Sequence, residues 1–445
     1  MNRKEFLQKS AVASLGLFSL PFMGASCQKE NIFEGIEFKG KVLIIGAGAA
    51  GLYAGYLLHK NNVDFQIIEA SGEIGGRMGK LESFADFPLD TGAQWLHGKK
   101  SVFGNFINDK NVTITKDNSD TSYWFKNELV NSLPKNIESE FEGNNLPDIS
   151  FENYAKELGY DDAYKNIVEG LAGDFGADAS RLSVYWSNKE FENWSSGDAD
   201  YKFQKTLFDV FNDFIIPEIS AKIIVNSPIN LVSYNDNGVL ISDTSGKQFT
   251  GDYAIITVPI TILKENYIKF SPELPLVKLV SFKKIGMDAG MKVFLKFTQS
   301  FYHENILGGK FCAAYADEKV GKKGNDHVLM AFIMGKQAEY LSSLSSDNEI
   351  ISILLAELDD MYNGKASKYF VKGYVKDWYK APFIKGAYSY STVNIGNARA
   401  VSAESVSNKL FFAGEAMNTN GHSQTVHGAM ETGEKSVKAI AQLLK

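Results

Sequence analysis

The chain has 445 residues, of which 44% are hydrophobic and 13% aromatic, and its formal net charge is −7. This length and apolar content suffice for a large core, usually divided among more than one domain, and exclude a disordered or fibrous protein. The acidic balance argues against a nucleic acid partner, because binding a phosphate backbone requires clustered lysine and arginine.

The first 27 residues have the pattern of a targeting segment and are left out of the fold. Arg3, Lys4 and Lys9 precede an apolar run from Ala11 to Met23, which is too short to span a bilayer. The run ends in small residues and Cys27, as in a bacterial lipoprotein signal, and its start is similar to a twin-arginine signal. We expect an exported, periplasmic or envelope-attached protein whose only membrane contact is a lipid on Cys27. An ordinary secretory signal is the alternative.

Cysteine and histidine usage predicts neither a disulfide nor a metal site. Cys312 is the one cysteine after Cys27, so the mature chain has no partner for an internal disulfide. No cysteine–histidine group has metal-ligand spacing, and we expect no metal ion. Stability must therefore come from packing and from a bound cofactor.

The predicted elements begin with a polar tether over residues 28–40. A buried strand follows at 41–45, then a helix at 49–61 and a second strand at 63–68. This β-α-β unit predicts parallel strands.

The middle of the chain differs in composition, since residues 100–215 are rich in Asn, Asp, Glu and aromatic residues. Further strands are predicted at 223–225, 230–234, 239–242, 253–258, 289–297 and 410–413, and helices at 151–158, 350–361 and 426–444. The last strand and helix pair is typical of a nucleotide-binding domain, like the first unit. We therefore predict a discontinuous Rossmann-type domain with another domain inserted into it.

A glycine pattern stands between the first strand and the first helix. Residues 46–51 match G-x-G-x-x-G, and Glu69 ends the next strand, which is the context that a dinucleotide site requires. Gly46 allows a tight turn, Gly48 lets the backbone approach a pyrophosphate, and Gly51 lets the helix pack close to the strand. The helix N-terminus attracts phosphate, and Glu69 can accept hydrogen bonds from ribose hydroxyls. The pattern alone does not separate NAD from FAD.

Two further motifs distinguish these cofactors. A Gly75-Gly76-Arg77 loop follows the second strand, and Gly414-Glu415 follows the last strand. Together with the fingerprint they resemble the flavin-dependent amine oxidase family, which includes monoamine, polyamine and spermine oxidases and lysine-specific histone demethylases. The resemblance runs from about residue 40 to 445. It implies that the loop lines a flavin and that Glu415 contacts the pyrophosphate or ribityl chain.

The segment from Asp90 to Gly98 resembles the family stretch that runs along the flavin into the substrate pocket. Because it contains His97, the segment is most similar to the polyamine and spermine oxidase branch. The resemblance implies that His97 lies in the substrate pocket. Taken alone, a single histidine is more often structural.

The predicted strand at 289–297 resembles the family strand whose first lysine points at flavin N5 through a water. Lys292 occupies that position. Alternation along a strand places Lys292, Phe294 and Lys296 on one face. Without the resemblance, the simplest interpretation is that both lysines face solvent. The resemblance instead implies a buried functional Lys292 and an exposed Lys296.

An aromatic pattern near residue 380 resembles the family's aromatic cage. Tyr388 would form one wall before the flavin, and Trp378 would flank the ring, whereas aromatic residues without this pattern are usually core. Monoamine oxidases carry a flavin-bound cysteine where this chain has Ala387, so we predict non-covalent FAD. The second cage aromatic is replaced by Thr425, in a stretch similar to the demethylase and polyamine branch; His422 is a weak substitute.

The resemblance thus implies an α/β fold with a discontinuous FAD-binding domain and an inserted α+β substrate-binding domain. The FAD-binding domain is expected at 40–98, 216–290 and 400–445, and the substrate-binding domain at 99–215 and 291–399. The expected catalytic residues are Lys292, Tyr388, Trp378 and His97. The expected FAD contacts are Gly46, Gly48, Ala49, Ala50, Gly51, Glu69, Ala70, Gly75, Gly76, Arg77, Gly92, Ala93, Gln94, Trp95, Ile229, Trp378, Gly414, Glu415, Thr425 and Val426.

The implied reaction is oxidation of a small-molecule amine, such as a polyamine, to an imine by hydride transfer to flavin N5, with O₂ reduced to H₂O₂. Acidic candidates for binding a polyamine are Glu190, Glu192, Asp198 and Asp200, although such runs are usually solvated surface. No arginine lies between residues 77 and 181, which disfavours an amino-acid substrate. The alternatives are an L-amino-acid oxidase, a flavin desaturase or protoporphyrinogen-type oxidase, and a flavin-binding envelope protein without activity.

Overall fold

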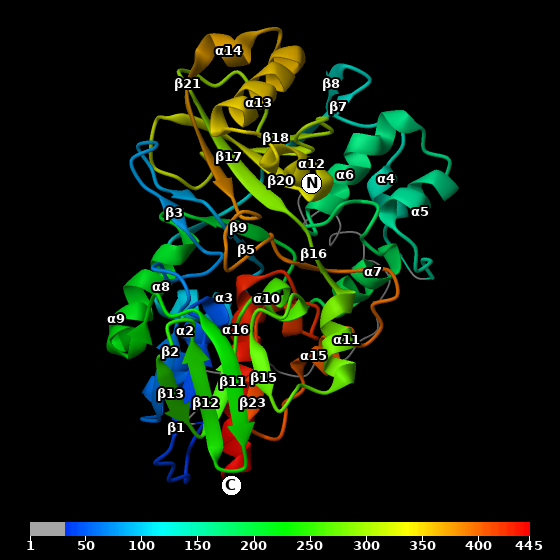
Figure 1. Ribbon diagram of the computed structural model, residues 1–445. Coiled ribbons are helices and arrows are strands. Elements are labelled where there is room, and N and C mark those ends of the chain that lie inside the picture. Colours follow the sequence, from blue (N-terminus) through cyan, green and yellow to red (C-terminus); the bar gives the residue numbers. More distant parts are fainter. Residues whose placement is uncertain (1–31, 144) are drawn as a thin grey trace, which may run out of the picture.

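The computed structural model describes residues 32–143 and 145–445, so the targeting segment predicted at residues 1–27 lies outside the described residues. Figure 1 shows two parts stacked along the long axis, one containing the C-terminal helix and the other a long twisted sheet. Within the described ranges, no helix combines the length and the apolar character that crossing a bilayer requires.

The lower part in Figure 1 is built on a five-stranded parallel sheet. Its strands in spatial order are β10 (Ile223–Ile224), β2 (Asp64–Ile68), β1 (Lys41–Ile45), β14 (Tyr253–Ile256) and β23 (Leu410–Phe412). They come from three distant stretches of the chain, so the predicted discontinuous Rossmann-type sheet is confirmed. Because the strand pairs are parallel, their carboxyl ends meet at one edge, where such sheets bind ligands.

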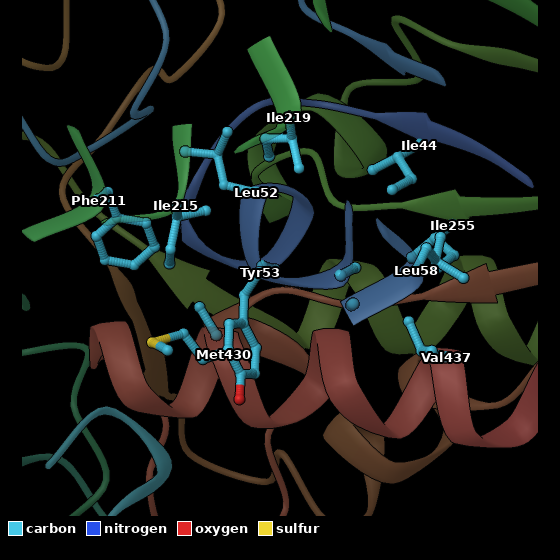
Figure 2. Packing of buried hydrophobic residues seen from close by; sticks show 14 of the residues in the cluster. Ile44, Leu52, Tyr53, Leu58, Phe211, Ile215, Ile219, Ile255, Met430 and Val437 are labelled. Carbon is cyan, nitrogen blue, oxygen red and sulfur yellow. The ribbon is translucent and has the colours of Figure 1, made fainter. Parts of the chain in front are cut away.

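Two helices pack on one face of this sheet, α2 (Ala49–Lys60) and α16 (Val426–Leu443). Figure 2 shows Met430 and Val437 of α16 directed toward the side chains of α2 and of the strands. A Cβ at Gly433 would lie 2.5 Å from the carbonyl oxygen of Ala50, so glycine permits this close contact. The first and last helices of the described chain therefore share one core.

The other face of the parallel sheet packs against a second layer and forms a separate apolar cluster. The layer consists of β13 (Gln248–Gly251), β12 (Gly238–Asp243), β11 (Ile229–Asn235), β15 (Lys269–Ser271), α10 (Ile260–Lys264), α11 (Leu276–Lys284), α15 (Ala398–Ala403) and η3 (Glu415–Met417).

The upper part contains a seven-stranded sheet. Its order is β21 (Phe370–Asp377), β17 (Gly290–Phe297), β20 (His327–Met334), β19 (Ala314–Asp317), β18 (Asn305–Leu307), β7 (Thr121–Phe125) and β8 (Glu128–Val130). Helices α12 (Gly335–Ser342), α13 (Asp347–Tyr362) and α14 (Lys365–Tyr369) accompany it. Along β17, Met291 and Val293 pack in the cluster that contains α13, whereas Phe294 packs in the cluster on the opposite face. The alternation expected for this strand is therefore present.

Shorter elements connect and flank the two parts. The strands are β3 (Lys80–Leu81), β4 (Leu89–Asp90), β5 (Trp95–His97), β6 (Ile114–Lys116), β9 (Asp200–Phe203), β16 (Ile285–Met287) and β22 (Ser389–Ser391). The helices are α3 (Val102–Asp109), α4 (Ile137–Glu140), α5 (Phe151–Glu157), η1 (Asp162–Tyr164), α6 (Lys165–Gly173), α7 (Val184–Glu192), α8 (Leu207–Phe214), α9 (Ile216–Ile219) and η2 (Ser220–Lys222).

One sequence-based expectation needs correction. The stretch at 28–40 is not a polar tether where it is described, because Phe33 is buried in the core beneath α2 and α16 and Phe38 packs against it. The core also continues across the predicted domain boundaries at 98 and 216, since Phe103 of α3 and Phe211 of α8 belong to the same cluster. The domain bounds themselves stay a prediction.

Candidate active site

A cavity of about 580 Å³ lies between the two parts, at the carboxyl edge of the parallel sheet. Its wall includes the turn after β1 and the residues after β14 and β23 in the lower part. It also includes Met291 and Lys292 of β17 and Phe332 of β20 in the upper part. The volume is within the range of cavities that enclose a cofactor or a drug-sized ligand.

The cavity brings together the expected catalytic residues and FAD contacts, with one exception. The wall includes Gly46, Gly48, Ala49, Ala50, Glu69, Ala70, Gly75, Gly76, Arg77, Gly92, Ala93, Gln94, Trp95, His97, Ile229, Lys292, Trp378, Tyr388, Gly414, Glu415, Thr425 and Val426. Gly51 is not part of the wall. A Cβ at Gly51 would lie 2.0 Å from the carbonyl oxygen of Gly46, so its role is the close packing of helix on strand.

The glycine turn fits a bound dinucleotide such as FAD. Gly46 has a φ of +108°, which glycine adopts without strain. A Cβ at Gly48 would have no heavy atom within 4 Å, so open space faces the backbone at the start of α2. Glu69 at the end of β2 is held in place, because its carboxylate accepts hydrogen bonds from the backbone N–H groups of Ala47 at 2.7 Å and Ser71 at 2.9 Å. Its remaining lone pairs suit ribose hydroxyls.

Arg77 and Glu415 form an ion pair that joins the early and late cofactor motifs. The Arg77 guanidinium is 2.9 Å from Glu415 Oε1 and also donates to the carbonyl oxygen of Ala387. Glu415 is buried and accepts from the hydroxyl of Ser389. Burial raises the pKa of Glu415, but Arg77, Ser389 and Arg399 together hold it below its usual value. The carboxylate therefore stays charged beside the cavity.

Lys292 is buried in the cavity wall, 3% exposed. Its amine donates to the backbone carbonyl oxygen of Asp90 at 3.0 Å and to Oε1 of Gln94. Burial lowers the pKa of Lys292 to about 8, against the opposing effect of nearby carboxylates. Lys296, expected to be exposed, is instead partly buried and pairs with Asp326 at 2.5 Å. Asp326, which directly precedes β20, thus gives the second lysine a partner.

Tyr388 and Trp378 supply aromatic surface to the cavity. The Tyr388 hydroxyl donates to the carbonyl oxygen of Asp174 at 3.1 Å, and its ring packs on Gly176, where a Cβ would lie 2.5 Å from the ring. The Trp378 indole N–H donates to the carbonyl oxygen of Thr91 at 2.8 Å. Both rings are therefore fixed in orientation by backbone acceptors.

His97 lies on the cavity wall, with Nδ1 2.8 Å from Oδ1 of Asp200. His422, considered as a replacement for the second cage aromatic, is not part of the wall. It is buried with its Nδ1 2.8 Å from Glu431, and its ring packs against Trp194. His422 therefore does not replace that aromatic.

The four acidic candidates for binding a polyamine also lie off the cavity. Asp200 holds His97, Glu190 binds Arg399 at 2.9 Å, Glu192 pairs with Lys189, and Asp198 is exposed. Asp174 lines the cavity instead, at the C-terminal end of α6. Asp174 belongs to no recognisable sequence motif. It reaches the cavity because α6 packs against β20.

Sequence reasoning also missed the wall residues that follow β14, Thr257 to Pro259, and those before β11, Ser227 and Pro228. A signal for the first set exists. The sequence predicts a strand at 253–258 in the FAD-binding domain, and the carboxyl ends of parallel strands in such a domain meet at one edge. The position of residues 227–228 depends on the packing of the β13-β12-β11-β15 sheet that follows them. No sequence pattern predicts that they reach the cavity.

Comparison with known proteins decides the family. Residues 208–441, more than half of the chain, match the model of the family described as flavin containing amine oxidoreductase, and residues 44–109 match an NAD(P)-binding Rossmann-like domain. The chain belongs to the flavin-containing amine oxidoreductase family. This family contains flavin, in agreement with the dinucleotide cradle in the cavity wall.

Relatives of the enzyme include both demethylases and oxidases. Human lysine-specific histone demethylase 2 is 25% identical over 440 residues, covering 90% of this chain and 53% of that protein. Polyamine oxidase 4 of Oryza sativa subsp. japonica is 26% identical over 441 residues, covering 88% and 86%. The chain thus spans about half the length of the human demethylase.

Solved structures of two amine oxidases share the fold. A putrescine oxidase variant superposes with a TM-score of 0.77 at 19% identity, covering 90% of this chain and 98% of that one. Cyclohexylamine oxidase from Brevibacterium oxydans superposes with a TM-score of 0.76 at 19% identity, covering 91% and 99%.

Proposed function

We propose that this enzyme oxidises amines, polyamines among them, to imines and reduces O₂ to H₂O₂. The observation that carries the proposal is the convergence of the Lys292 amine, the Tyr388 ring and the dinucleotide cradle on one cavity. These groups come from residues more than 300 positions apart, so their meeting is a property of the folded chain.

The cavity residues divide into those that hold FAD and those that face the substrate. The turn from Gly46 to Gly51 and the N-terminus of α2 suit the pyrophosphate, Glu69 suits the ribose, and Arg77 supplies positive charge nearby. When bound, FAD would supply the acceptor for the hydride, with its two electrons, that leaves the carbon next to the amine nitrogen. Ala387 offers no side chain for a covalent bond, and we propose that FAD is held non-covalently.

The substrate-facing residues favour the neutral amine. Tyr388, Trp95 and Phe332 line the cavity with aromatic surface, and an unpaired ammonium loses hydration there at high cost. Lys292 holds a proton at Nζ inside the same cavity. The arginine on the described wall, Arg77, is engaged by Glu415, which supports an amine rather than an amino-acid carboxylate as substrate.

A panel of amines tests the proposal. Under anaerobic mixing, an amine substrate should bleach the yellow absorbance of the bound flavin, and admission of air should restore it with release of peroxide. A flavin that stays oxidised with every amine, or one that is bleached only by amino acids or by a desaturase substrate, contradicts the proposal.

Asp174 is the wall carboxylate that we assign to the second ammonium of a diamine or polyamine, because Glu69 and Glu415 belong to the cofactor part of the cavity. Asp174→Asn should raise KM for putrescine or spermidine by about 10-fold. This factor corresponds to the lower end of the free energy that a hydrogen bond to a charged group contributes. KM for a monoamine of similar length should hardly change. Steady-state kinetics on both substrates check this.

The exposed Asp162→Asn, the same change at the start of the helical segment that precedes α6, is the matched control. Equal effects of Asp174→Asn on the diamine and the monoamine would show that Asp174 shapes the cavity without binding charge.

For location, we propose export on the strength of the targeting pattern in residues 1–27. Cell fractionation of the full-length chain, and of a Cys27→Ser variant, tests export and lipid attachment separately.

A further inference from the structure

A cluster of buried charges lies behind the cavity wall at Lys292. Lys292, Lys202, Asp90 and Glu318 are each no more than 3% exposed, and the side chain of Lys322 is 2% exposed. We call these five residues the lysine–carboxylate cluster. They come from β17, β9, β4 and the segment after β19, and among them only Lys292 is part of the cavity wall. Buried charges are costly unless they are paired, so this arrangement requires an explanation.

Gln94 connects Lys292 to the rest of the cluster. Its amide nitrogen donates to Glu318 Oε1 at 3.0 Å, and its carbonyl oxygen accepts from Lys292. A carboxylate only accepts hydrogen bonds, so Glu318 determines which end of the amide faces the lysine. With the opposite amide orientation, two donors would face each other. Glu318 therefore fixes the acceptor that holds the Lys292 amine.

Lys202 places a second positive charge beside the same groups. Its Nζ is 3.7 Å from Glu318 Oε1 and donates to the carbonyl oxygen of Asp317 at 2.9 Å. The ring of Trp95 has Lys202 Nζ at 5.3 Å and Lys292 Nζ at 5.7 Å from its centroid. The two ammonium groups thus share one aromatic ring and are connected to one carboxylate, in an interior where charges act strongly on each other.

We propose that Glu318 and Lys202 are positioning residues that orient Lys292 and set, with opposite signs, how readily it holds its proton. The inference rests on the proposed function of Lys292 and adds two residues that contact neither the substrate nor the cavity. The negative charge of Glu318 favours the ammonium form of Lys292, and the positive charge of Lys202 disfavours it.

Other charged groups also lie near Lys292, and the experiment described below leaves them unchanged. Asp90 accepts from Lys292 through its backbone, and its carboxylate is 3.5 Å from Lys322. On the neighbouring strand β21, Lys376 stands opposite Lys292 in register and lies over the Trp378 ring. Burial raises the pKa of Asp90 to about 7, which gives a second titrating group in this interior.

The experiment compares Glu318→Gln and Lys202→Met in the FAD-loaded enzyme. The absorbance spectrum of bound oxidised FAD is titrated between about pH 6 and 10, and the transition that Lys292→Met abolishes is assigned to Lys292. Glu318→Gln should lower the midpoint of that transition by about one unit, and Lys202→Met should raise it by about one unit. The double variant restores the charge balance, so its midpoint should be close to that of the parent enzyme. It provides the test if one of the single variants does not fold.

Lys205→Met is the matched control. It removes the same charge three residues away, from a side chain that is 70% exposed and paired with Asp213, and should leave the midpoint unchanged. Shifts of equal sign, no shift in either variant, or no transition that depends on Lys292 would overturn the inference. Amine oxidation by the parent enzyme would remain intact in those cases, so failure of the inference is distinguishable from failure of the proposed function.

Discussion

Replacing Lys292 with methionine is expected to slow the reaction of the reduced enzyme with oxygen by about 100-fold, the lower end for a positioned proton-transfer group. Reduction of O₂ to H₂O₂ takes up two protons, and negative charge develops on oxygen on the way. The Lys292 amine is a buried cationic group on the cavity wall, held by Asp90 and Gln94, and methionine has similar length without charge. Stopped-flow mixing of anaerobically reduced enzyme with oxygenated buffer measures the rate.

The affinity for FAD should change much less than this rate in the same variant, because the cradle residues are untouched. Lys296→Met is the control, since Lys296 is on the same strand and face but pairs with Asp326 at its far end. Unchanged oxygen kinetics in Lys292→Met, or equal slowing in both variants, would refute the role of Lys292.

Gly48→Leu should give a folded protein whose affinity for FAD is lowered by about 100-fold, which corresponds to ~3 kcal/mol of steric cost. Gly48 has extended backbone with φ −83°, so an L-residue is tolerated there, and its missing Cβ faces open space in the cavity. The added side chain would occupy the space that the pyrophosphate needs. Quenching of flavin fluorescence measures the affinity, and circular dichroism checks the fold.

Two neighbouring variants sharpen this result. Gly48→Ala should have a smaller effect than Gly48→Leu, because only one methyl group enters the cavity. Gly51→Ala should instead damage folding itself, since its Cβ would collide with the backbone of Gly46 at 2.0 Å. Equal FAD affinity in Gly48→Leu and the parent enzyme would mean that the dinucleotide does not approach this turn.

The fold class and a dinucleotide site were predictable from the sequence because their signals are local, whereas the choice of FAD over NAD came from the family resemblance. A strand, a glycine turn, a helix and a terminal acid follow one another within 30 residues, and each has a direct conformational reason, such as the positive φ of Gly46. The roles suggested for Lys292 and Tyr388 came from family motifs, and the structure places both residues on one wall.

Tertiary structure alone decided how the rest of the site is assembled. Asp174 reaches the cavity because α6 ends there, while the acidic run near residue 190 turns away to bind Arg399 and His97. The lysine–carboxylate cluster likewise joins four separate strands and loops. The sequence by itself determined the cradle, since backbone conformation is encoded by neighbours along the chain. Long-range packing determined which charges share a dry interior, because charge pairing depends on distance in space and leaves no pattern in spacing.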